Sequence, residues 1–175
     1  MNFNVRLFKR INALVGTSKW LDAFGRAGAE LVVVAMLVWF VIVDLFAYLP
    51  SKRAVIIPIL FLGTTWTAGW FLDLFIGLIV REPRPHMTHT ESKLLFTPLM
   101  NWKSFPSDHG MSAWLIFFMA VIFHLPFAYG LGPLALWVSW GRVYAGVHYP
   151  FDIVGGMAVA GLVATGAYYV LVMLS

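Results

Sequence analysis

The sequence contains no cysteine and few charged residues. Of its 175 residues, 11% are Asp, Glu, Lys or Arg and 61% are hydrophobic. The absence of cysteine excludes disulfides, thiolate nucleophiles and Cys-ligated zinc or iron–sulfur sites. A soluble domain of this length would carry roughly twice this charged fraction. The composition therefore indicates an integral membrane protein.

Acidic residues are also scarce, with 8 Asp and Glu against 12 Lys and Arg, which gives a net charge of +4. A modest positive charge suits the anionic head groups of membrane lipids. We therefore expect membrane lipids as partners and no nucleic acid, and the sequence leads to no prediction of a protein partner.

Long apolar runs predict an all-α fold, a polytopic membrane bundle of about five helices, because a span needs roughly 20 residues. The length fits a single membrane-embedded domain, residues 1–175. Residues 1–20 are expected to form an interfacial amphipathic helix, with Phe8 on its apolar face and Arg6, Lys9, Arg10 and Asn12 on its polar face. The expected spans are Ala27–Leu49, Ala54–Val80, Ser107–Phe127, Leu131–Gly146 and Pro150–Leu174.

The only long polar stretch lies between the second and third spans. It is predicted to be an active-site loop, residues 81–106, because loops of this length are uncommon in compact chains and are often functional. Five spans would place this loop, the start of the third span and the connection between the fourth and fifth spans on one side of the membrane.

The segment from Arg142 to Asp152 combines an arginine, a histidine and a carboxylate. Pro150 is typical of the first turn of a helix, which places Asp152 one turn after His148. A carboxylate on one ring nitrogen fixes the tautomer and leaves the other nitrogen free to attack. Arg142 offers a planar fork for phosphate oxygens. Taken alone, the segment could also be a polar helix end at the lipid head groups.

A second segment reads Pro106-Ser107-Asp108-His109. Ser107 can cap the following span, and a helix N-terminus is a good phosphate site. His109 would lie within that site and could act as a general acid. Alternatively, this segment could be an ordinary helix cap without a catalytic role. A third segment, Arg84-Pro85, follows the second span and could be a head-group anchor.

Taken together, these segments resemble the type 2 phosphatidic-acid phosphatase superfamily, whose signature is K-x6-R-P, P-S-x-H and R-x5-H-x3-D. The second and third motifs match at every key position. Within the superfamily, the chain resembles the bacterial undecaprenyl-diphosphate phosphatases of the bacitracin-resistance type. This likeness rests on Arg81-Glu-Pro-Arg-Pro85, Ser104-Phe-Pro-Ser-Asp-His109 and Gly146-Val-His-Tyr-Pro-Phe-Asp152.

The resemblance implies dephosphorylation of undecaprenyl diphosphate, a polyprenyl diphosphate lipid, to undecaprenyl phosphate, without a metal or another cofactor. His148 would attack the terminal phosphorus and form a phosphohistidine, with Asp152 orienting it. His109 would protonate the departing lipid phosphate and then activate water. The residues implied to bind phosphate are Arg84, Arg142, Ser107 and Asp108.

The chain departs from the family pattern at Gly77, where the first motif has a lysine. Arg81, one helical turn on, or Lys103 could supply the missing cation. Asp73 shares the helical face of Gly77 and Arg81, so we expect it to pair with an arginine. Possible further substrate-binding residues are Arg81, Glu30 and His89, and Glu30 could instead order an active-site arginine.

Other functions remain open at this stage. The substrate could be phosphatidylglycerophosphate or phosphatidic acid, or the protein could bind anionic lipids without catalysis. A histidine-based metal site, formed by His86, His89, His109 and His148, is a further alternative.

Two arguments about membrane orientation disagree. The resemblance implies a bacterial inner-membrane protein whose active site faces outside the cytoplasm. The positive-inside rule favours the opposite orientation. Its evidence is the many cations near the N-terminus, against only Lys52 and Arg53 on the other side.

Overall fold

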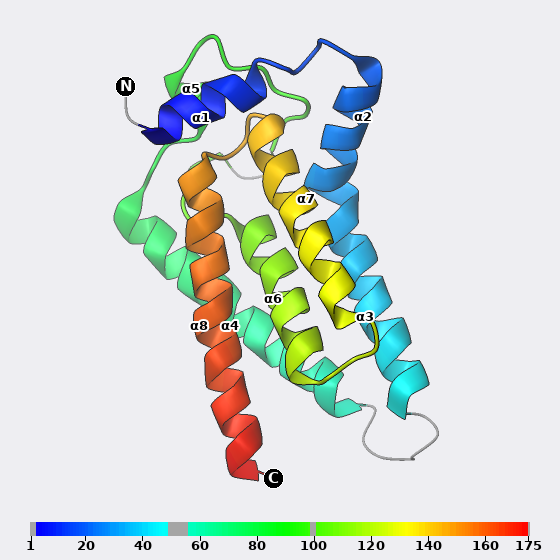
Figure 1. The fold of residues 1–175 in the computed structure, drawn as a ribbon. Coiled ribbons are helices and arrows are strands. Elements are labelled where there is room, and N and C mark those ends of the chain that lie inside the picture. The colour runs from blue at the N-terminus through cyan, green and yellow to red at the C-terminus, as the bar shows by residue number, and fades with distance from the viewer. Residues whose placement is uncertain (1–2, 49–55, 99–100, 175) are drawn as a thin grey trace.

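The computed structural model describes residues 3–48, 56–98 and 101–174, and these form helices joined by loops (Figure 1). No strand occurs in these ranges, and the predicted all-α class is confirmed. The helices are α1 (Phe3–Asn12), α2 (Lys19–Arg26), the π-helical turn η1 (Ala27–Leu31), α3 (Val32–Tyr48), α4 (Ile56–Val80), α5 (Pro85–Thr88), α6 (Asp108–Ile122), the 3-10 turn η3 (Ala128–Gly130), α7 (Leu131–Tyr144) and α8 (Pro150–Leu174).

Within the described ranges, three segments are long and apolar enough to cross a membrane: Lys19–Tyr48, Ile56–Thr88 and Pro150–Leu174. Helices α6 and α7 have only 15 and 14 residues. At 1.5 Å per residue each is roughly 20 Å long, against a hydrocarbon core of roughly 30 Å. The predicted membrane helical bundle is confirmed, whereas the number of five spanning helices stays a prediction. The expected span ends Leu49 and Ala54, and the cations Lys52 and Arg53, lie outside the described residues.

Helix α6 lies inside the bundle and packs against α3, α4, α7 and α8. Its side chains Met111, Leu115 and Met119 are fully buried. Helices α6 and α8 approach closely at Gly156, where a Cβ would lie 2.5 Å from the Ser107 carbonyl oxygen and 2.8 Å from the Met111 nitrogen. Small residues allow such close packing of membrane helices. The missing side chain therefore brings the starts of α6 and α8 together.

The three motif-bearing segments meet at one end of the bundle. In Figure 1, α4 and α7 end toward the top of the view, where α6 and α8 begin. The polar connection between α4 and α6 covers this end together with α1. The chain topology thus produces the convergence that the order of the apolar runs predicts.

Helix α1 lies across this end and contacts α7 and α8 (Figure 1). Phe8 packs edge-on against Tyr149, with ring centroids 5.3 Å apart. The sequence pattern predicts Asn12 on the polar face, but in the structure its side chain is buried. Its amide nitrogen donates to the carbonyl oxygens of Lys93 at 2.8 Å and Tyr144 at 3.0 Å. Helix α1 therefore fastens the polar connection to the bundle.

We expect Gly156→Ala to destabilise the protein by about 1–3 kcal/mol, because the new methyl group would overlap backbone atoms of α6. Gly161→Ala is the matched control on the same helix, since its methyl group would meet only an ordinary contact 3.9 Å away, on the Phe118 ring. Thermal unfolding in detergent micelles measures both variants. Equal melting temperatures would contradict the close approach of α6 and α8.

Candidate active site

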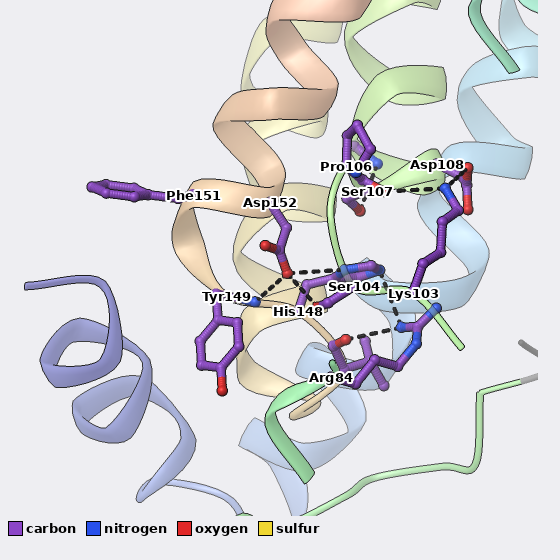
Figure 2. Close-up of polar contacts among 12 residues, drawn as sticks. Arg84, Lys103, Ser104, Pro106, Ser107, Asp108, His148, Tyr149, Phe151 and Asp152 are labelled. Carbon is purple, nitrogen blue, oxygen red and sulfur yellow. Dashed lines mark hydrogen bonds and ion pairs between the residues drawn. The ribbon is translucent and has the colours of Figure 1, made fainter. Parts of the chain in front are cut away.

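His148 and Asp152 lie where α7 leads into α8. Gly146 turns the chain with a φ of +82°, and a Cβ there would lie 2.3 Å from the Lys93 carbonyl oxygen. Glycine suits both constraints because it tolerates a left-handed backbone and leaves room for the neighbouring chain. His148 Nδ1 lies 3.3 Å from Asp152 Oδ2, and both side chains are buried (Figure 2). The predicted contact between the two residues is confirmed.

Asp152 also binds two other groups through the same oxygen. Its Oδ2 accepts hydrogen bonds from Ser104 Oγ at 2.5 Å and from the backbone N–H of Tyr149 at 2.7 Å (Figure 2). Its carbonyl oxygen accepts from the backbone N–H of Ser107 at 3.1 Å. The sequence assigns no role to Ser104, and nothing in its spacing indicates a bond to a residue 48 positions away. Asp152 thus joins the second and third motif segments.

Arg84 reaches His148 from the residue that precedes α5. Its Nη1 donates to the Val147 carbonyl oxygen at 2.9 Å and lies 3.3 Å from His148 Nε2 (Figure 2). An arginine can only donate hydrogen bonds, so this contact assigns Nε2 as the acceptor and Nδ1 as the nitrogen that carries the proton toward Asp152. This is the tautomer that nucleophilic attack by Nε2 requires.

The surroundings of His148 favour its neutral form. Burial disfavours the charged imidazolium, and the guanidinium groups of Arg142 and Arg84 repel it. The pKa of His148 therefore lies well below its ordinary value of 6.5. At neutral pH, His148 is therefore unprotonated at Nε2, whose lone pair faces the Arg84 N–H.

Ser107 caps α6 as predicted, because its Oγ accepts a hydrogen bond from the Gly110 N–H at 3.3 Å. Asp108 and His109 follow in the first turn of the helix. Asp108 Oδ1 lies 2.7 Å from Lys103 Nζ, so its carboxylate is ion-paired. The phosphate-binding roles of Ser107 and Asp108 stay predictions.

Arg142, in the last turn of α7, packs against η1. Its Nη1 donates to the Ala29 carbonyl oxygen at 3.1 Å, and its guanidinium lies over the Phe96 ring, 5.6 Å from the centroid. Gly141 permits this packing, because a Cβ there would lie 2.6 Å from the Ala29 nitrogen. The buried Arg142 Nε has no hydrogen-bond partner within the described residues. The guanidinium therefore has donor capacity left for an anion.

A cavity of about 800 Å³ joins these charged groups to the interior of the bundle. Its polar lining includes Arg84, Asp108, His109 and Arg142. Most of the remaining lining is apolar and comes mainly from α3 and α4, with Leu37, Leu62 and Trp66 among its members. A cavity with these two kinds of lining suits a ligand with an anionic head and an apolar tail.

Of the other predicted site residues, one lines the cavity and two do not. Glu30 lines the cavity from η1. Arg81 and His89 are not among the residues that line it: Arg81 is exposed and its Nε donates to the Leu78 carbonyl oxygen at 2.9 Å, and the His89 ring lies 6.2 Å from the Tyr149 ring. Substrate binding by these three residues stays a prediction.

Two arrangements that the sequence suggests, a histidine metal site and an Asp73–arginine pair, do not occur among the described residues. No group of three or more His, Asp or Glu residues able to hold a metal ion occurs in the described part of the chain, so the proposed four-histidine cluster does not form. The expected pairing of Asp73 with an arginine is wrong. Its carboxylate oxygens are buried and make no hydrogen bond to any described residue, and the charges that act on it are Asp108 and Lys103.

Residues 58–174 match the PAP2 superfamily, which covers more than half of the chain. The chain is similar to the undecaprenyl-diphosphatase BcrC of Bacillus subtilis (strain 168), with 31% identity over 157 residues, or 90% of this chain and 78% of that protein.

Two crystal structures share the fold. LpxE of Aquifex aeolicus is 24% identical with a TM-score of 0.71, and the match covers 95% of each chain. The first transmembrane PAP2 type phosphatidylglycerolphosphate phosphatase from Bacillus subtilis is 22% identical with a TM-score of 0.69, over 100% of this chain and 89% of that one. These two structures show the fold, and by its sequence the chain belongs to the PAP2 superfamily.

Proposed function

We propose that the protein is a metal-independent lipid phosphatase that hydrolyses undecaprenyl diphosphate to undecaprenyl phosphate and so recycles the lipid carrier of cell-wall synthesis. The observation that carries this proposal is a neutral, oriented His148, whose Nε2 lies 3.3 Å from Arg84, a residue that lines the cavity together with Arg142. Binding an anionic lipid requires no such imidazole, which favours catalysis over simple binding. The similarity to BcrC, named an undecaprenyl-diphosphatase, supports the choice of lipid.

The cavity supports a lipid substrate placed with its head among the arginines. Arg84 and Arg142 would bind the terminal phosphoryl oxygens, and the N-terminus of α6 would add backbone donors. The first units of the isoprenoid tail would lie between α3 and α4, against the apolar lining. In this placement, the positive charge that stabilises the transition state comes from the two guanidinium groups.

The first chemical step transfers the terminal phosphoryl group to His148. A phosphoryl oxygen is a stronger acceptor than Nε2, so it would draw the Arg84 N–H away and free the Nε2 lone pair. A P–N bond then forms while the bond from phosphorus to the bridging oxygen breaks. His109 protonates the departing undecaprenyl phosphate, and Asp152 holds the Nδ1–H throughout.

The second step hydrolyses the phosphohistidine. His109, now neutral, takes a proton from a water molecule as its oxygen attacks phosphorus. The P–N bond breaks, inorganic phosphate leaves, and His148 returns to its neutral tautomer. One histidine thus serves as acid in the first step and as base in the second.

We also propose that the protein lies in the bacterial inner membrane, with this end of the bundle facing outside the cytoplasm. Undecaprenyl diphosphate is released there by cell-wall synthesis, as the family resemblance implies. The exposed Arg6 and Arg10 of α1 would then contact anionic head groups of the outer leaflet.

Purified protein with EDTA should release phosphate from undecaprenyl diphosphate faster than from phosphatidylglycerophosphate or phosphatidic acid. His148→Ala should lower the rate by about 10³-fold or more, because it removes the nucleophile. His109→Ala should slow turnover by about 10²–10⁴-fold and leave binding of a phosphate analogue largely intact.

The matched control for both variants is His124→Ala, which changes an exposed histidine beyond the far end of α6. Full activity of His148→Ala, or no activity on any lipid, would refute the catalytic proposal. A preference for phosphatidic acid would retain the chemistry but reject undecaprenyl diphosphate as substrate. Inhibition by EDTA that zinc reverses would indicate a metal-dependent enzyme instead.

The acid limb of kcat/KM should lie below pH 6.5, because the lowered pKa of His148 keeps the nucleophile neutral into the acidic range. Arg84→Gln removes a positive charge that opposes protonation, so it should raise the pKa of His148 and move the acid limb to higher pH. Rates measured across pH on the same lipid test this shift, since ionisation of the substrate is common to both enzymes. An unshifted limb would argue against His148 as the titrating nucleophile.

The cysteine-free sequence permits a simple test of orientation. In Figure 1 the segment between α1 and α2 lies at the site end, and the connection between α6 and α7 lies at the opposite end. The first segment contains the exposed Ser18 and the second the exposed Tyr129, so the test variants are Ser18→Cys and Tyr129→Cys. A membrane-impermeant maleimide applied to spheroplasts should label the first variant and not the second. The reverse pattern would place the site in the cytoplasm.

A further inference from the structure

Lys103 is one of the largest fully buried side chains of the protein, with 2% of its surface exposed. Lysine is almost never buried to this extent unless it is paired. Its aliphatic chain packs against Gly77 on α4, where a Cβ would lie 2.5 Å from Lys103 Cδ and 3.5 Å from Cε. Any side chain at position 77 would therefore compete with Lys103 for the same space.

The ammonium group of Lys103 lies at the start of α6. Its Nζ is 2.7 Å from Asp108 Oδ1 and donates to the Pro106 carbonyl oxygen at 3.3 Å (Figure 2). Both partners flank Ser107, the residue that caps α6. Lys103 thus ties the loop before α6 to the first turn of the helix that carries His109.

The Asp108 side chain is unfavourable for an anionic substrate, because a carboxylate cannot donate a hydrogen bond to a phosphoryl oxygen. The predicted phosphate binding by Asp108 would therefore have to come from its backbone N–H at the start of α6. Asp108 lines the cavity together with Arg84 and Arg142, the groups expected to bind phosphate. An unpaired Asp108 would repel a phosphoryl group in this partly buried site. Asp73, buried on α4 one turn before Gly77, would add a second negative charge when ionised.

We propose that Lys103, passing across Gly77, is the positioning residue that neutralises Asp108 and fixes the start of α6, so that the cavity accepts a phosphoryl group. The family pattern has a lysine at position 77 on α4. Here Gly77 leaves that space empty, and Lys103 from the loop before α6 passes through it and supplies the positive charge. This inference rests on the proposed function, but its central claim concerns phosphate binding and can be measured without turnover.

The first experiment compares Lys103→Met with Lys103→Met/Asp108→Asn. In the single variant, KM for undecaprenyl diphosphate and Kd for inorganic phosphate should each rise about tenfold or more, as expected for one uncompensated charge near an anion. The double variant should return both constants to within about threefold of wild type, since the introduced asparagine carries no charge to neutralise. The control is Lys93→Met, an exposed lysine of the same connection that donates to the carbonyl oxygens of Ala13 and Val15.

The second experiment moves the lysine to the helix. Gly77→Lys/Lys103→Ala should recover phosphate binding relative to Lys103→Ala, because a side chain at 77 enters the space that Lys103 vacates. Melting temperatures in detergent identify variants that fold. Unchanged phosphate affinity in a folded Lys103→Met protein would overturn the proposal. Failure of Asp108→Asn to restore binding would also overturn it, because Lys103 would then contact phosphate directly.

The outcome also separates this inference from the proposed function. If the wild-type protein hydrolyses no lipid phosphate, the proposed function fails, while phosphate affinities of the variants still test Lys103. Suppose instead that the wild-type protein is active, while Lys103→Met lowers both kcat and the folded fraction but leaves KM unchanged. In that case the lysine is merely structural and the inference fails.

Discussion

The site depends on one buried carboxylate. Asp152 Oδ2 lies within hydrogen-bonding distance of His148, Ser104 and the Tyr149 backbone, and the Asp152 carbonyl oxygen binds the backbone of Ser107. These bonds connect the first turn of α8 to the loop before α6. A buried carboxylate would be costly without such partners. The side-chain bonds all involve Oδ2, whereas the buried Oδ1 has no hydrogen-bond partner among the described residues. The same bonds that stabilise the carboxylate also hold His148, the proposed nucleophile, and the start of α6, the proposed phosphate site, in register. The Asp152 carboxylate therefore both connects α8 to the loop before α6 and orients His148.

The sequence predicts what depends on local spacing. Composition is sufficient for the membrane bundle, and a spacing of four residues at a helix start is sufficient for the His148–Asp152 contact, because helical geometry fixes that distance. Contacts between distant segments are different. The bond from Ser104 to Asp152 and those from Asn12 to Lys93 depend on tertiary packing that no periodicity encodes. The expected pairing of Asp73 with an arginine is wrong because α4 ends at Val80, before Arg81. The Arg81 side chain instead turns back and donates to the Leu78 carbonyl oxygen.

Three positions without a side chain shape the site, and two of them, Gly141 and Gly77, place positive charge in it. Gly141 lets α7 approach η1, so that Arg142 reaches the Ala29 carbonyl oxygen. Gly156 lets α8 meet the start of α6, and Gly77 leaves space for Lys103. Compared with the family motif alone, Gly77 means only that the motif's lysine is missing. The structure assigns it a steric role instead, because the space it leaves is occupied by a cation from another part of the chain.

Helix α1 and the polar connection are bound to each other. Asn12 bonds the Lys93 backbone in both directions, and Lys9 lies 2.5 Å from Glu91. In the proposed membrane placement, α1 lies at the bilayer surface and sets how far His148 and His109, the proposed catalytic groups, lie from the plane of the lipid head groups. A substrate phosphorus would have to sit at that depth to react. Lipids would then be sorted by the distance between their reactive phosphate and the membrane surface, and variation far along the hydrocarbon tail would have little influence on the rate.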